Sequence, residues 1–264
     1  MSADDDLTDR SAGRYLTAIT HFGGPRRHLE ISGNRPFERL NVTMFPPPQP
    51  RRRVASRSVA IGPLTARSRN DWGCPDGDAA PLWKPAYTTV THAVVHHTAG
   101  SNSLLDWEAE VRNIWYFHTF GNAWGDIGYN YLIDPNGVIY EGRAGGPGAI
   151  GAHFSCRNTN TVGVALLGTF TSGLPTAAAL DSLKSLLAAL CARNSIDPAA
   201  FAYHAPSALN VPTIIGHREG NGSSLTCTRT ECPGNALYAM LPAIRSDVAA
   251  LRLHMPTRKR SIRP

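Results

Sequence analysis

A short apolar segment that ends in two histidines constrains the fold of this chain more than any other feature. The segment 91–100 reads THAVVHHTAG: the β-branched Val94 and Val95 lead directly to His96 and His97, and a glycine ends the run. This composition is typical of a buried strand that stops at a turn. Because side chains alternate between the two faces of a strand, His96 and His97 should point in opposite directions, and only one can enter a given cavity.

Two later motifs offer side chains that complement a histidine at a strand end. The motif GHRE supplies His217 directly after a short apolar run, and the motif TECPG supplies Cys232 before a Pro-Gly pair. With His96 they make three candidate ligands, and two imidazoles with one thiolate suit zinc better than calcium or magnesium. Three protein ligands with an open fourth position are the pattern of a catalytic zinc site. Cys227 lies in the same stretch and is a rival ligand to Cys232.

Four motifs in this order resemble the zinc-dependent N-acetylmuramoyl-L-alanine amidases, which share a fold with peptidoglycan recognition proteins and phage T7 lysozyme. The motifs are VVHHTAG, DIGYNYLIDPNGVIYEGR, GAHFSCRNTNTVGVALLGTF, and GHRE with TECPG, within about residues 68–252. The resemblance implies an α/β fold whose mixed central β-sheet is flanked by helices on both faces. It also implies hydrolysis, with zinc as cofactor, of the amide bond between N-acetylmuramic acid and L-alanine in bacterial peptidoglycan.

The resemblance assigns roles to the metal-binding and catalytic side chains. It implies that His96, His217 and Cys232 bind zinc, because Cys232 alone carries the family's context before Pro-Gly. The stretch between GHRE and TECPG is longer than in most relatives, so Cys227 remains an alternative ligand to Cys232. Tyr129 matches the family tyrosine whose phenol reaches toward the metal, and Thr230 stands where relatives carry Thr or Lys.

The same comparison predicts the substrate contacts. The segments that border the groove in relatives supply His118, Trp124, Arg143, His153 and Asn158. A guanidinium suits a carboxylate, so Arg143 is a candidate partner for the extra carboxylate of a diaminopimelate stem peptide. The residue pair that separates stem-peptide types in relatives is Ala144-Gly145 here, and it matches neither known type.

Two other functions have to be weighed against the enzyme. A peptidoglycan-recognition protein that binds without cleaving is the main alternative, but such members characteristically replace the Cys ligand. A nucleic-acid binder with a structural zinc is disfavoured, because residues 71–252 hold 10 basic and 14 acidic residues and no paired CxxC spacing is present. Neither Glu141 nor Glu219 is expected to be a general base; each is interpreted as structural.

The charge of the chain divides it into three segments. Residues 1–67 form a Pro- and Arg-rich extension expected to be largely irregular, 68–252 the amidase domain, and 253–264 a basic tail. The net charge of +6 belongs to the flanks, since residues 1–70 hold 12 Arg against 6 acids and the tail holds four basic residues. Such ends are either solvated or associate with an anionic wall polymer.

The setting of the protein follows from its expected substrate. Peptidoglycan as substrate implies an extracellular or cell-wall location, although the acidic first residues do not resemble a secretory leader. No apolar run is long enough to predict a transmembrane helix. We expect a monomer with a muropeptide partner and no specific nucleic acid.

The remaining cysteines are interpreted from their surroundings. Cys74 and Cys156 lie in loop-like contexts and are candidates for a disulfide in an oxidising compartment. Cys191 shares the apolar stripe of a predicted helix, 176–193, and should be a buried free thiol.

Periodicity predicts the other elements. A helix capped by Asn102 or Ser103 should run to about Phe120, and a closing helix should run from Asn235 to about Leu251. Alternation over 127–133 predicts a strand on which Ile127, Tyr129, Tyr131 and Ile133 share one face. The turn DPNG then leads into a returning strand at 138–140, and 161–169 reads as a strand buried on both faces. A short element is expected somewhere in 15–22, and Trp72 is expected to pack under the sheet.

Overall fold

The computed structural model of the protein describes residues 58–80, 82–224 and 226–254. The element expected near 15–22, and most of the two basic flanks, lie outside the described residues. Within the described part of the chain, no helix has both the length and the apolar character needed to cross a membrane.

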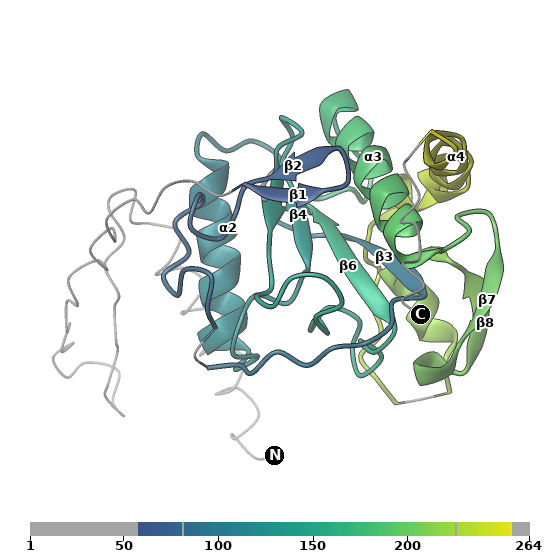
Figure 1. The fold of residues 1–264 in the computed structure, drawn as a ribbon, viewed down its shortest axis with the longest axis horizontal. Coiled ribbons are helices and arrows are strands. Elements are labelled where there is room, and N and C mark those ends of the chain that lie inside the picture. The colour runs from purple at the N-terminus through teal and green to yellow at the C-terminus, as the bar shows by residue number, and fades with distance from the viewer. Residues whose placement is uncertain (1–57, 81, 225, 255–264) are drawn as a thin grey trace, which may run out of the picture. The chain divides into compact units, whose positions relative to one another are not determined.

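A five-stranded mixed sheet forms the centre of the fold (Figure 1). Its strand order is β5-β4-β6-β3-β9, with bounds Ile139–Glu141, Tyr131–Ile133, Thr161–Leu166, His92–His97 and Ile214–Gly216. β4, β6, β3 and β9 run parallel, and only β5 is antiparallel to its neighbour. The mixed sheet expected from the sequence is therefore confirmed.

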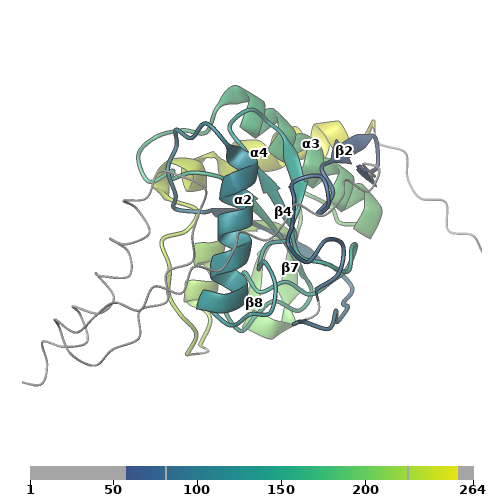
Figure 2. The ribbon, with the colours of Figure 1, turned by 90° about the vertical axis from the view of Figure 1, so that its left-hand side faces the viewer.

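Helices cover both faces of this sheet. α3 (Ala177–Asn194) and α4 (Asn235–Arg252) pack on one face, where their apolar side chains share a core with alternate residues of β3, β4 and β6. α2 (Trp107–Tyr116) lies on the opposite face, in a second core that includes the buried Trp72. Figure 2 shows α2 in front of the sheet with α3 and α4 behind it. Flanking helices on both faces were expected, and so was the packing of the tryptophan.

The alternation of β3 decides which histidine faces which side. Val95 belongs to the core under α3 and α4, whereas Val94 packs with Phe154 on the α2 face. His96 shares the α2 face with Val94, because it lies two residues further along the strand. His97 points the other way, where its Nδ1 accepts a hydrogen bond of 3.2 Å from the backbone N–H of Phe170. The opposite orientation expected for the two histidines is confirmed.

The helix on the α2 face begins later than predicted. Asp106, not Asn102 or Ser103, caps it by accepting a hydrogen bond from the Ala109 N–H. The side chain of Asn102 instead bonds both backbone groups of Thr169, so tertiary contacts removed it from the capping role. The helix continues as a π-helical turn, η1 (Phe117–Gly121).

The strand predicted at 127–133 is shorter and does not keep one alternation. Tyr131 and Ile133 face the α3–α4 core, whereas Ile127 and Tyr129 pack on the α2 side. The prediction that all four side chains share one face was therefore wrong. The cause lies at Asn130. Its side-chain Oδ1 accepts the N–H of Gly163 at 2.8 Å, so a side chain replaces a backbone carbonyl in the ladder and the alternation shifts.

Two hairpins complete the fold. β1 (Val59–Ile61) and β2 (Leu64–Ala66) pair antiparallel, and Ile61 and Ala66 are buried in the main core, so the irregular character expected up to 67 does not hold here. β7 (Phe201–His204) pairs with β8 (Leu209–Pro212), with the single 3₁₀ turn η2 (Ala205–Ser207) between them. The 3₁₀ segment η3 (His217–Gly222) follows β9.

Candidate metal centre and its surroundings

The register of two parallel strands brings two histidines together. β3 and β9 pair so that Val95 lies opposite Gly216, which places His96 beside His217 where both strands end. Their ring centroids are 4.8 Å apart, and His96 is only 1% exposed. The carboxyl ends of parallel strands are a recurrent location for ligand sites.

Cys232 completes a cluster of three possible ligands from distant parts of the chain. The ligand atoms of His96, His217 and Cys232 all lie within 4.8 Å of one another, and we refer to them as the His–His–Cys cluster. The Cys232 Sγ lies 3.6 Å from the His96 Nδ1 and accepts a hydrogen bond of 3.4 Å from the His97 N–H. Two imidazoles and a thiol at this spacing fit the donor set of a catalytic zinc site.

Burial sets the protonation of these groups. It holds the pKa of His96 well below its usual range and lowers the pKa of His217 to about 4, so both imidazoles are neutral at pH 7 and have a free lone pair. Burial also raises the pKa of Cys232 to about 12, which keeps the thiol protonated by itself. A divalent cation would have to displace that proton, since the thiolate is the ligand form.

Three sets of contacts fix the loop that carries Cys232. The Asn221 side chain bonds the Thr230 N–H and the Thr230 carbonyl, at 3.0 and 2.8 Å. The Thr230 hydroxyl accepts the Cys232 N–H at 3.0 Å, and the Cys232 carbonyl accepts the Arg218 N–H at 2.9 Å. Thr230 is half-buried beside the cluster. Asn221 was not singled out from the sequence, where an Asn in a Gly-rich stretch indicates only a turn.

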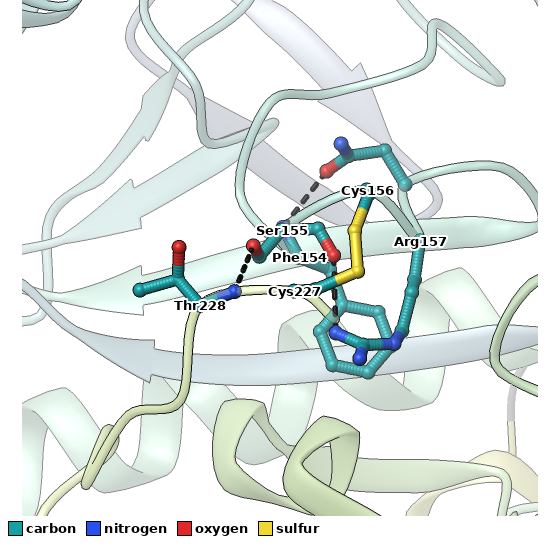
Figure 3. The surroundings of a disulfide bond; sticks show 7 residues. Phe154, Ser155, Cys156, Arg157, Cys227 and Thr228 are labelled. Atoms are coloured by element: carbon teal, nitrogen blue, oxygen red, sulfur yellow. Dashed lines mark hydrogen bonds between the residues drawn. A yellow bond between two sulfur atoms is a disulfide. The ribbon is translucent and has the colours of Figure 1, made fainter. Parts of the chain in front are cut away.

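A disulfide joins this loop to the segment that follows His153 (Figure 3). It links Cys156 to Cys227, with the Cα atoms 6.2 Å apart, and the Thr228 N–H donates to the Ser155 hydroxyl beside it. The expected pairing of Cys74 with Cys156 was therefore wrong. Cys74 is a free thiol buried against the core of the α2 face. Because Cys227 is in the disulfide, it is not available as the rival ligand.

Three aromatic rings extend from the cluster toward solvent. The Tyr129 ring lies 5.2 Å from His96, and the His118 ring lies 5.3 Å from Tyr129 and 4.7 Å from Trp124. The His118 Nδ1 accepts the Gly128 N–H at 3.0 Å, so the hydrogen of its neutral ring sits on Nε2. Burial raises the pKa of Tyr129, which keeps its phenol protonated. Trp124 is 40% exposed and lies at the outer end. We refer to Tyr129, His118 and Trp124 as the aromatic row.

Two predicted substrate contacts lie behind the cluster. His153 is buried and its Nδ1 lies 3.0 Å from the His96 Nε2. Burial lowers the pKa of His153 to about 3, so this ring is also neutral. The Asn158 side-chain oxygen accepts the N–H groups of His153 and Phe154 and thereby holds the turn around His153. The structure therefore assigns both residues contacts within the protein.

Arg143 is also occupied by the protein. It is 4% exposed, its guanidinium lies 3.8 Å above the Trp83 ring, and it donates to the carbonyls of Asp126, Ile127 and Trp124. A role for it in reading a stem-peptide carboxylate stays a prediction, and the structure shows a backbone-holding role.

A buried ion pair supports the same segment and was missed in the sequence. Arg69 and Asp126 are 3.0 Å apart with side chains at most 1% exposed. Asp126 accepts the Ile127 and Ala144 N–H groups, and Arg69 donates to the Gly77 carbonyl. Lone charged residues in loop-like stretches carry no sequence signal for such a pair.

The two glutamates considered as bases do not join the cluster. The ligand atoms gathered in the described residues include no carboxylate. The Glu219 carboxylate is buried beside Gly216 and Tyr238, and Glu141 ends β5 at the edge of the sheet.

Comparison with known proteins identifies the family. The model of the N-acetylmuramoyl-L-alanine amidase family matches residues 86–235. The chain therefore belongs to this family, whose members act in the recognition or processing of peptidoglycan.

Three relatives illustrate the match. Peptidoglycan-recognition protein LB of Drosophila melanogaster is 33% identical, over 69% of this chain and 70% of its own length. A solved structure of wild-type Drosophila PGRP-LB superposes with a TM-score of 0.52 at 30% identity, covering 67% of this chain and 91% of that one. An N-acetylmuramoyl-L-alanine amidase of Sus scrofa is 31% identical over 69% of this chain, but over only 27% of its own length. Peptidoglycan recognition protein LE, solved in complex with tracheal cytotoxin, a monomeric diaminopimelic acid-type peptidoglycan, is 26% identical with a TM-score of 0.51 and coverage of 67% and 92%.

Proposed function

We propose that this protein is a zinc-dependent amidase that hydrolyses the bond between N-acetylmuramic acid and the L-alanine of the stem peptide in bacterial peptidoglycan. The observation that carries the proposal is the His–His–Cys cluster, with its ligand atoms within 4.8 Å of one another and Tyr129 beside it. The family membership supports the substrate class.

The cluster is the site that would hold zinc. His96 and His217 would supply neutral imidazoles, and Cys232 a thiolate stabilised by the hydrogen bond from the His97 N–H. Bound zinc lowers the pKa of a coordinated water to about 7 and polarises a carbonyl, which an unreactive amide requires.

The chain's own residues would supply hydrogen-bond donors around the reacting amide. Tyr129 keeps its proton, so its phenol can donate to the carbonyl oxygen as negative charge develops there. Accepting the Cys232 N–H uses only a lone pair of the Thr230 oxygen, so its hydroxyl can still donate a hydrogen bond. A hydroxyl supplies no positive charge, so the contribution of Thr230 should be smaller than that of Tyr129.

Substrate binding is assigned to the exposed end of the aromatic row. His118 would present its Nε2–H, and Trp124 would supply an apolar face against a sugar or peptide. The relative bound to tracheal cytotoxin supports a muropeptide as the ligand. The Cys156–Cys227 disulfide supports an oxidising location, in keeping with an extracellular or wall-bound substrate. The protein would act as a monomer, with its basic flanks near anionic wall polymer.

Recognition without cleavage is the second candidate, supported by the relatives named for peptidoglycan recognition. Such a protein needs the fold and the aromatic row but not a metal. The presence of all three ligand residues favours the enzyme.

Zinc content and muropeptide cleavage test the proposal together. Wild-type protein should hold one zinc per chain and release a stem peptide with a free L-alanine amine from muramyl-tripeptide, as seen by mass spectrometry. Cys232→Ser should lose most of the zinc and the cleavage. His97→Asn is the matched control, because that side chain faces away from the cluster and an Asn oxygen can still accept the Phe170 N–H.

Each outcome decides between the candidates. Wild-type protein that binds the muropeptide but releases no peptide, with or without zinc, is a recognition protein. Full cleavage by Cys232→Ser would refute the proposed metal centre.

A further inference from the structure

The ring of His153 lies directly behind the His–His–Cys cluster. Its Nδ1 is 3.0 Å from the His96 Nε2, with the two rings nearly perpendicular and their centroids 5.0 Å apart. On its far side, the His153 Nε2 lies 3.4 Å from the Thr161 hydroxyl. The ring is 4% exposed, so it is placed to act through His96 rather than on a substrate.

Two glycines make room for this ring. A Cβ added at Gly163, in the middle of β6, would lie 2.5 Å from two carbons of the His153 ring. A Cβ at Gly151 would lie 2.4 Å from the same ring. Glycine in the middle of a strand is destabilising relative to Ala, so its presence here is explained by the close approach of the imidazole.

Counting hydrogens along the contacts defines both tautomers. The Thr161 hydroxyl donates to the Asn158 carbonyl at 2.7 Å, so its oxygen can only accept from His153. The hydrogen of the neutral His153 ring therefore sits on Nε2, and Nδ1 is an acceptor. That acceptor takes the hydrogen of the His96 Nε2, which leaves the His96 Nδ1 with a free lone pair, directed at the Cys232 sulfur 3.6 Å away.

We propose that His153 is a positioning residue that holds His96 in the tautomer whose Nδ1 lone pair faces the metal position. The contacts Thr161–His153–His96 form a hydrogen-bonded chain, which we call the relay, in which each hydrogen is assigned to one donor atom. Partners of this kind, which bond the second nitrogen of a ligating histidine, raise metal affinity by fixing the ring and its tautomer. The nature of the metal rests on the proposed function, but the tautomer does not.

The first test measures zinc binding. His153→Leu removes the acceptor, and the zinc dissociation constant, measured by competition with a chromophoric chelator, should rise about 10- to 100-fold. His153→Asn places an amide oxygen near the former Nδ1 and should recover most of the affinity. Thr161→Val keeps the buried shape and removes only the far end of the relay, so it should weaken zinc binding less than His153→Leu; it also serves if His153→Leu does not fold.

The second test reads the tautomer directly. Long-range ¹⁵N–¹H correlation spectra of the metal-free wild type should show the His96 hydrogen on Nε2. A hydrogen on Nδ1, or equal zinc affinity in wild type and His153→Leu, would overturn the assignment. Wild-type protein that binds zinc yet cleaves no muropeptide would refute the proposed function and leave the relay intact, so the two failures are distinguishable.

Discussion

The Cys156–Cys227 disulfide offers the most quantitative test of the structure. It connects the segment after His153 to the loop that carries Cys232, across a sequence separation of 71 residues. Closing a loop of that length in the unfolded chain is worth about 4 kcal/mol in the chain-entropy model. Because a typical domain is stable by only about 5–15 kcal/mol, replacing both cysteines with serine should be strongly destabilising.

The assay is urea and thermal unfolding of wild type and the Cys156→Ser/Cys227→Ser double variant, both with the metal removed. We expect the unfolding free energy to fall by about 4 kcal/mol. The melting temperature should drop by roughly 8–16 °C, given about 2–4 °C per kcal/mol for a domain of this size. Adding a reductant to wild type should reproduce the variant and leave the variant itself unchanged, which is the internal control.

Thiol counting checks the connectivity independently. Denatured wild type should show three reactive thiols, those of Cys74, Cys191 and Cys232, and five after reduction. A peptide map that joins Cys74 to Cys156, or an unfolding free energy that is the same in wild type and the double variant, would refute this reasoning.

Three further predictions concern the Arg69–Asp126 ion pair, the buried His92 and the aromatic row. Arg69→Met should lower the unfolding free energy by about 3–5 kcal/mol in urea titrations, because it leaves the Asp126 carboxylate buried without its partner. The control is Lys184→Met, which breaks pairs with the exposed carboxylates of Asp181 and Asp247 and should lower it by less than about 1 kcal/mol. Equal losses in the two variants would contradict the argument. Burial lowers the pKa of His92 to about 4, so folded His92 stays neutral while the unfolded side chain takes up a proton below about pH 6.5. As the pH is lowered from about 6.5 to 4, the unfolding free energy of the metal-free protein should therefore fall, by up to about 1.4 kcal/mol per pH unit for this group. His92→Asn should make that pH dependence shallower, and parallel curves for the two proteins would contradict the role given to His92. Trp124→Ala should weaken muropeptide binding roughly tenfold in calorimetry. Phe201→Ala, which removes a still more exposed aromatic ring on β7, should leave the binding unchanged, and the reverse order would refute a binding role for the aromatic row.

Much of the fold could be predicted because the information was local. The alternation of 92–97 sends His96 and His97 to opposite faces whatever the rest of the chain does. The helix predicted at 176–193 is found at Ala177–Asn194, capped by Thr176, since an amphipathic stripe and its capping residue are close in sequence. Where a local pattern met a competing distant partner, it failed, as at Asn102 and Asn130.

The sequence by itself also contained the residues of the candidate site, but not all of their relationships. It determined which strand ends carry imidazoles and which cysteine precedes Pro-Gly. Only the tertiary structure decided that Cys156 pairs with Cys227, that Arg69 neutralises Asp126, and that His153 stands behind His96. The physical reason is that strand and helix periodicity arises from neighbouring residues, whereas these partners are 57 to 71 positions apart and meet only because the sheet register and the loop paths bring them together.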